Sequence, residues 1–437
     1  MSEFKITTSW SPTGGRNEVD MTFCNLMIEV GNKVVTEFID GRDNVVPQLQ
    51  IPAYYLAEWM AENWWALLWE PRKSEEDNSQ STSPTFNARH SLLSGQHGFA
   101  LPRLLFLPQG GSVYITASGR DVELAGVRFR NTASTTLKRD AVEQVLRDFV
   151  AKVVARLEAA SIKGTFLQDA WIQIIDTDEE EAQFCRCAGA LGLSPYDVDD
   201  AIADLIERLQ PVLGDRLLMD LCLSSTPQTF KSVAALAEEA ALLTKNAATS
   251  TLSPLETVRL PADNLSVHAY RRGVQAADLI RRRLGIKDTD PAGATKVFDM
   301  LRVDTSIRGE PRRRTDEEIS ITGAVVRDDS DMRVALLQET QPKRRFAAAR
   351  AVFSGWSAEP HESRLLTSAV TRDQQANRAF AAELTAPKAL LRKRASKNFL
   401  SQSAVYELAG ELMIGPDVVA KNAENNGIET AWPRSGP

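Results

Sequence analysis

The residues of this 437-residue chain that could carry catalysis are few and widely spaced. Its four histidines are His90, His97, His268 and His361. Segment 90–98 combines two of them with serines and glycines, the ingredients of a hydrolase, but the sequence indicates no third member for such a site. Glu362 follows His361, yet Leu365 stands where a zinc-binding H-E-x-x-H motif needs its second histidine.

The cysteines also predict no metal centre. The chain has only Cys24, Cys185, Cys187 and Cys222, so a disulfide framework is not expected. Cys185 and Cys187 lie two residues apart in a predicted helix, and side chains at that spacing point away from each other. We therefore expect neither a metal nor another cofactor.

The most specific pattern lies between residues 265 and 428 and has four parts. In chain order they are RRRLGI at 281–286, RRFAAA at 344–349, QANRAFAAEL at 375–384 followed by Pro387, and VYELAGELMIGPDVVAKNAENNGI at 405–428. This series resembles the ImmA/IrrE metallopeptidase family, in which an RRF segment precedes an H-E-x-x-H helix and an acidic residue precedes a later ANxFAAEL segment. The resemblance implies a mostly helical, zincin-like C-terminal domain.

The resemblance also implies that the zinc site is degenerate. In register with the RRF segment, Arg350 takes the position of the first histidine, Ala351 that of the general base and Ser354 that of the second histidine. Asp373 stands near the position of the third ligand. A guanidinium cannot ligate zinc and repels it, and one carboxylate does not make a site. We expect a pseudopeptidase rather than an active enzyme.

Proteins of this family act in stress responses, mobile elements and phage-related regulation, often by engaging a repressor. The resemblance therefore implies a non-catalytic regulatory or protein-interaction protein in a bacterial phage-defence or mobile-element system, with a protein partner bound in the old peptide cleft. Two alternatives stay open. One is a nucleic-acid-binding regulator that uses C-terminal basic clusters, and the other is a zinc-dependent peptidase with atypical ligands.

Basic clusters recur in the second half of the chain. They comprise Arg281, Arg282, Arg283, Arg312, Arg313, Arg314, Arg344 and Arg345, with a further run at 392–397. If they converge on one face they could bind nucleic acid, and otherwise they are solvated helix ends. The helix pair at 403–428 has the spacing of a helix-turn-helix, but Asp417 and Glu424 disfavour base contacts, so packing is its expected role.

Hydrophobic periodicity divides the chain into three regions that must position these residues. Residues 1–160 alternate strand-like and helical patterns and include a tryptophan-rich helix at 53–70, which predicts an α+β domain. Residues 165–260 read as a helical middle region. The family resemblance implies that residues 261–430 form a degenerate peptidase-like domain, and alternating apolar residues predict strands at 321–326 and 333–338 within it. The predicted fold class is α+β and multidomain.

Composition sets the remaining expectations. The net charge of −7 argues against a protein that coats nucleic acid. No stretch approaches the roughly 18 apolar residues that a membrane helix needs, and the first residues lack the features of a signal peptide. We expect a cytoplasmic protein without membrane association, and the sequence leaves its oligomeric state open.

Overall fold

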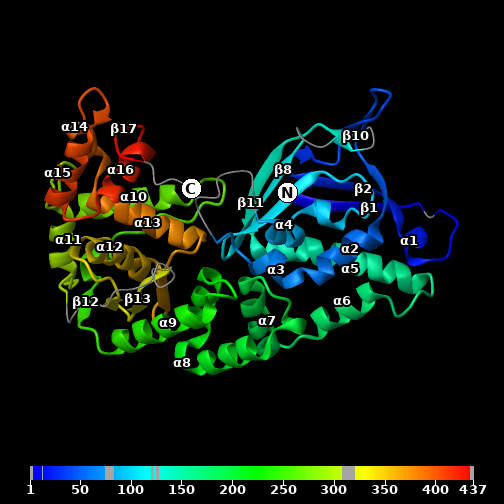
Figure 1. Cartoon of the computed structure of the whole chain (residues 1–437), viewed down its shortest axis with the longest axis horizontal. Helices are drawn as coiled ribbons and strands as arrows, with labels where there is room; N and C mark the ends of the chain where they lie inside the picture. Colours follow the sequence, from blue (N-terminus) through cyan, green and yellow to red (C-terminus); the bar gives the residue numbers. More distant parts are fainter. Residues whose placement is uncertain are drawn as a thin grey trace. The chain divides into compact units, whose positions relative to one another are not determined.

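The chain folds into two compact units, residues Met1–Ala203 and Asp204–Pro437 (Figure 1). The structure is a computed structural model that describes residues 3–11, 13–73, 83–119, 123–124, 127–307 and 320–433. Helices and strands both contribute, which confirms the α+β class. The predicted division into three regions stays a prediction, since the borders near residues 160 and 260 fall inside these units.

In its described residues, unit 1 has three antiparallel sheets. The first consists of β1 (Phe4–Trp10), β2 (Phe23–Val30), β3 (Lys33–Val34) and β6 (Leu49–Pro52), with β1, β3 and β6 all paired to β2. The second has the order β11-β8-β7 and comprises β7 (Arg103–Pro108), β8 (Ser112–Ser118) and β11 (Ala133–Lys138). The third, β5-β4-β10-β9, is built from β4 (Phe38–Ile39), β5 (Val45–Val46), β9 (Glu123–Leu124) and β10 (Val127–Phe129). Burial alternates along β2, as expected for a strand with one face in a core.

Helices complete the core of unit 1. They are α1 (Glu18–Met21), α2 (Ala53–Glu62), α3 (Trp64–Trp69), α4 (Pro84–His90), α5 (Arg139–Ala159), α6 (Phe166–Asp176) and α7 (Glu179–Leu191), with 3₁₀ turns at Leu92–Gly95 and Pro195–Asp197. The tryptophan-rich segment, predicted as one helix, is divided at Asn63, whose side-chain amide donates to the Trp59 carbonyl at 2.9 Å. Trp64 is buried against Trp171, so this segment serves the core.

Unit 2 is centred on one antiparallel sheet. Its strands run in the order β12 (Thr249–Thr251), β14 (Asp331–Leu336), β13 (Ile321–Arg327), β15 (Ser363–Thr367). β13 and β14 confirm the two predicted strands. The sequence did not predict β15, which forms the edge of the sheet beside β13.

The helices of unit 2 pack on this sheet or on one another (Figure 1). They are α8 (Asp200–Ser224), which is kinked at Gly214, α9 (Phe230–Lys245), α10 (Tyr270–Arg283), α11 (Gly293–Leu301), α12 (Gln341–Ser357) and α13 (Arg372–Thr385), with a 3₁₀ turn at Ser253–Leu255. α9 packs on β13 and β14, α12 packs on β13, β14 and β15, and α13 contacts both α12 and α10. A Cβ atom at Gly273 would lie 2.0 Å from the Ala376 carbonyl oxygen, so α10 can approach α13 this closely only because position 273 is glycine.

The end of the chain forms a small layer with its own core, coloured orange to red in Figure 1. We call residues 386–433 the C-terminal subdomain. It comprises α14 (Lys388–Arg394), β16 (Phe399–Leu400), α15 (Gln402–Leu412), α16 (Pro416–Asn425) and β17 (Glu429–Thr430), with β16 and β17 parallel. The predicted helix pair is therefore present, and its apolar side chains, such as Val405 and Val419, are buried between the helices.

Candidate functional site

Helix α12 carries Arg350, Ala351 and Ser354, the positions that the family resemblance aligns with a zinc site. It begins after Thr340 with a proline in its first turn, a position where a missing N–H costs nothing. Alanines at 347–349 and 351 let it pack closely, and it is buried almost continuously from Arg345 to Trp356. Residues four apart lie one turn apart on one helix face, so Arg350 and Ser354 point the same way.

Arg350 is buried, with an exposed fraction of 4%, and its guanidinium makes hydrogen bonds to three other elements. Nε donates to Asn377 Oδ1 at 2.9 Å, and Nη2 donates to Gln374 Oε1 at 2.8 Å. Nη2 also donates to the Thr367 carbonyl at 2.6 Å, and Nη1 to Thr322 Oγ1 at 3.2 Å. The side chain therefore ties α12 to α13, β13 and β15.

Ser354 belongs to the same network. The Asn377 side-chain amide donates to Ser354 Oγ at 3.2 Å and to Gln374 Oε1 at 2.9 Å. Both histidine positions of the resemblance thus meet the same face of α13. A catalytic zinc site needs three protein ligands converging in this way, but the groups here are a guanidinium, a hydroxyl and two amides. Ala351, at the general-base position, is a fully buried methyl group.

Asp373 does not join this network. Its carboxylate lies 3.3 Å from Arg364, 3.5 Å from Arg272 and 3.9 Å from Arg216. Burial alone would raise the pKa of Asp373, but these three guanidiniums outweigh it and lower that pKa. Asp373 therefore serves an ion cluster, and Gln374 and Asn377 are the α13 residues that face Arg350. The register of the resemblance pointed to Asp373 on α13, whereas the side chains of α13 that contact Arg350 are Gln374 and Asn377.

The free edge of β15 is capped by side chains. Leu365 N donates to Asp220 Oδ2 at 3.0 Å, and its carbonyl accepts from Gln374 Nε2 at 2.7 Å. Thr367 N donates to Gln374 Oε1 at 3.1 Å, and its carbonyl accepts from Arg350. An exposed strand edge is the surface on which peptides add as an extra strand. At residues 365 and 367 this edge is already satisfied from within unit 2.

Among the described residues, several arginines of the predicted basic clusters point into the protein and not to a shared surface. Arg281 is 1% exposed and donates to the Leu384 carbonyl at 2.7 Å. Arg345 is 3% exposed and donates to Thr295 Oγ1 at 3.0 Å. Burial lowers the pKa of both arginines, and neither charge reaches the surface.

The other members of those clusters divide between internal and exposed roles. Arg344 donates to the Leu336 carbonyl at 2.8 Å, whereas Arg282 and Arg283 are exposed at the end of α10. Arg312, Arg313 and Arg314 lie outside the described residues.

The histidine segment of unit 1 has a structural role. His90 is fully buried, lies 2.9 Å from Glu70 and stacks on Phe86 at a ring-centroid distance of 3.9 Å. Burial lowers the pKa of His90, against the raising effect of Glu70, so the ring is neutral near pH 7. His97 stacks on Tyr55 instead. A fully buried imidazole does not meet a substrate, so the two histidines do not form a hydrolase site.

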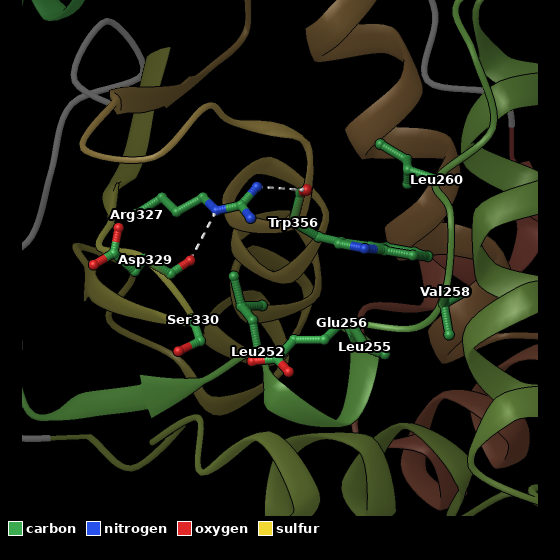
Figure 2. Close-up of a pocket in the computed structure, with 9 residues that line it drawn as sticks. All are labelled: Leu252, Leu255, Glu256, Val258, Leu260, Arg327, Asp329, Ser330 and Trp356. Atoms are coloured by element: carbon green, nitrogen blue, oxygen red, sulfur yellow. Dashed lines mark hydrogen bonds between the residues drawn. The ribbon is translucent and has the colours of Figure 1, made fainter.

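A pocket of about 400 Å³ in unit 2 is lined by none of the predicted site residues (Figure 2). Trp356 forms one wall, and four aliphatic side chains from the segment after β12 contribute apolar surface; these are Leu252, Leu255, Val258 and Leu260. Arg327 crosses the pocket, with its guanidinium held by the carbonyls of Trp356 and Ala358. This volume suits a small ligand or a partner's side chain. The mixed sequence of 252–260 carries no pattern that would have identified it.

Comparisons with protein-family models, curated proteins and solved structures give no significant match. Among the described residues there is no group of three or more His, Cys, Asp or Glu side chains that could hold a metal ion. Within that same part of the chain, every helix is too short or too polar to cross a membrane.

Proposed function

We propose that this chain is a non-catalytic regulatory protein that acts by binding a partner protein. In this proposal residues 265–428 are a degenerate ImmA/IrrE-like domain with a zincin-like scaffold. The observation that carries it is the buried guanidinium of Arg350, at the position of the first zinc-binding histidine, hydrogen-bonded to Asn377 and Gln374.

The chemistry of that position supports the proposal. Arginine has no lone pair to give to zinc at any physiological pH, and its positive charge opposes a bound cation. Ala351 cannot activate a water molecule. The hydrogen bonds of Arg350 connect α12 to α13 and β15, which is the mechanical role that a shared metal would play in a zinc peptidase.

The capped edge of β15 bears on where a partner binds. A partner that adds a strand there has to displace hydrogen bonds from Asp220, Gln374 and Arg350. We therefore place partner recognition outside this edge of β15, and binding in the old peptide cleft stays a prediction. The pocket beside Trp356 offers apolar surface for a partner's side chain. A phage-defence or mobile-element system is the setting that the family resemblance suggests.

The test compares zinc content and peptidase activity in the wild type and in a restored variant. Arg350→His, Ser354→His and Asn377→Asp together place two imidazoles and a carboxylate where the present side chains meet. Arg350→Ala, Ser354→Ala and Asn377→Asp form the matched control, which opens similar space without imidazoles. Hydrogen exchange of α12 and α13 establishes that each variant is folded.

We expect no zinc in the wild type after incubation with the ion, about one zinc per chain in the restored variant, and none in the control. Bound zinc also raises the midpoint of thermal unfolding of the restored variant alone. Stoichiometric zinc or zinc-dependent cleavage by the wild type would sink the non-catalytic proposal. A folded restored variant that binds no more zinc than the control would sink the peptidase-scaffold relationship.

A further inference from the structure

The C-terminal subdomain contains a short stretch of one charge sign. Residues 386–400 carry Lys388, Arg392, Lys393, Arg394 and Lys397, and no aspartate or glutamate. The whole chain has a net charge of −7, so this excess is local. Local excess charge on an acidic protein is a feature of binding surfaces for oppositely charged partners.

A tight turn presents part of this stretch. Ser396 and Phe399 exchange two backbone hydrogen bonds of 3.0 Å each. Lys397 and Asn398 between them both have positive φ angles, 49° and 63°, as in a two-residue hairpin turn. Asn398 Nδ2 donates to the Gly427 carbonyl at 2.6 Å, which fixes the turn to the end of α16. The backbone at Lys397 is therefore held in a fixed conformation.

Three of the cations are available to a ligand. Arg394 is paired with Glu411 at 2.7 Å. Arg392, Lys393 and Lys397 are exposed, and none of the three has an ion pair within the described part of the chain. Glu429, opposite Phe399 in the β16–β17 pair, limits the basic surface on that side.

Two aromatic rings of the C-terminal subdomain are exposed. Phe399, two residues from Lys397, is 41% exposed, although a phenyl ring normally favours the interior. Tyr406 is 55% exposed and leans on Trp432 at a ring-centroid distance of 5.1 Å. Cations that follow a phosphate backbone, together with a ring on which a base stacks, form the usual surface for single-stranded nucleic acid.

We propose that the surface formed by Arg392, Lys393, Lys397 and Phe399 binds single-stranded nucleic acid without sequence preference. Duplex recognition fits less well, because α16, the second helix of the helix-turn-helix-like pair, exposes Asp417 and Glu424, which repel phosphates. An acidic protein would use the cations but would leave the exposed phenyl ring unexplained. The proposal is independent of the degenerate zinc site.

The experiment is fluorescence anisotropy of a labelled oligo-dT and a labelled duplex of equal length, titrated with the full chain over a range of salt concentrations. The first variant combines Arg392→Ala, Lys393→Ala and Lys397→Ala. Its matched control, Lys163→Ala with Lys231→Ala and Lys245→Ala, removes three exposed lysines elsewhere. The second variant is Phe399→Ala, with Phe399→Tyr as the version that retains a ring.

We expect the wild type to bind oligo-dT with a slope of log affinity against log salt of about −2, as contact with three phosphates of a single strand predicts. The triple variant brings that slope close to zero, and the control leaves it unchanged. Phe399→Ala weakens oligo-dT binding by roughly 5- to 150-fold, the range for loss of one stacked base. Phe399→Tyr, which retains an aromatic ring, binds oligo-dT with the affinity of the wild type.

Three results would overturn the proposal. One is oligo-dT binding that the triple variant leaves intact. Another is equal affinity for duplex and single strand with no effect of Phe399→Ala, which would indicate backbone contact alone. The third is tighter binding of poly-glutamate than of oligo-dT, which would point to an acidic protein partner.

Discussion

Replacing Arg350 by alanine tests whether its guanidinium holds α12 to α13. In the variant, Asn377 Oδ1 loses its hydrogen bond from Arg350 Nε, which is 2.9 Å long in the wild type. An unsatisfied buried acceptor lowers the free energy of unfolding by about 1–3 kcal/mol. Gln374 Oε1 and the Thr367 carbonyl keep other donors and contribute less. Loss of the buried aliphatic stem adds about 1–2 kcal/mol. The expected destabilisation of unit 2 is therefore about 2–5 kcal/mol.

Hydrogen exchange measured by mass spectrometry is the appropriate assay, because a chain with two units need not unfold in one step. The expected free-energy change corresponds to a rise of roughly 30- to 5,000-fold in the exchange rates of the protected amides of α12 and α13. Arg282→Ala, at an exposed arginine on α10, is the control and shifts stability by less than about 0.5 kcal/mol. Equal exchange in wild type and Arg350→Ala would refute the view that this arginine is a structural tie.

Two further predictions concern packing and pH. Gly273→Ala destabilises unit 2 by about 1–3 kcal/mol, because its new Cβ would lie 2.0 Å from the Ala376 oxygen. Gly410→Ala is the control, since a Cβ at position 410 has no atom within 4 Å, and thermal unfolding shows it to be neutral or stabilising. Unit 1 loses stability as the pH falls, because the folded pKa values of His90 and Glu70 both lie below their unfolded values. Burial lowers the pKa of His90, so its contribution starts to fall below about pH 6.5, the unfolded value. For Glu70, burial opposes the hydrogen bonds from His90 and Arg89, which hold its pKa at about 2, so its contribution falls from about pH 4.3 downward. His90→Gln removes the upper step of the stability curve measured by circular dichroism, and an unchanged upper step would contradict the neutral buried ring.

The sequence predicted those elements whose patterns are local. Strands β13 and β14 follow from their periodicity, and the segments that carry the family resemblance lie on the helices α12 and α13. β15 was missed because five residues, SRLLT, are too short for a periodic signal.

The orientation of individual side chains depends on contacts between distant segments. Asp373 turns toward Arg364, Arg272 and Arg216, which come from three different parts of unit 2, and this leaves Gln374 and Asn377 for Arg350. Arg281 is buried because α10 meets α13 at Gly273 and brings the Leu384 carbonyl within reach. No periodicity within one helix contains this information.

The guanidinium of Arg350 also determines the conditions under which its domain keeps its shape. Histidine and carboxylate ligands take up protons as the pH falls, so a zinc-tied scaffold loosens in acid or when the free ion becomes scarce. A guanidinium keeps its charge throughout the physiological pH range and needs no ion from the cell. The connection of α12 to α13 through Arg350 therefore persists through zinc starvation and mild acidification.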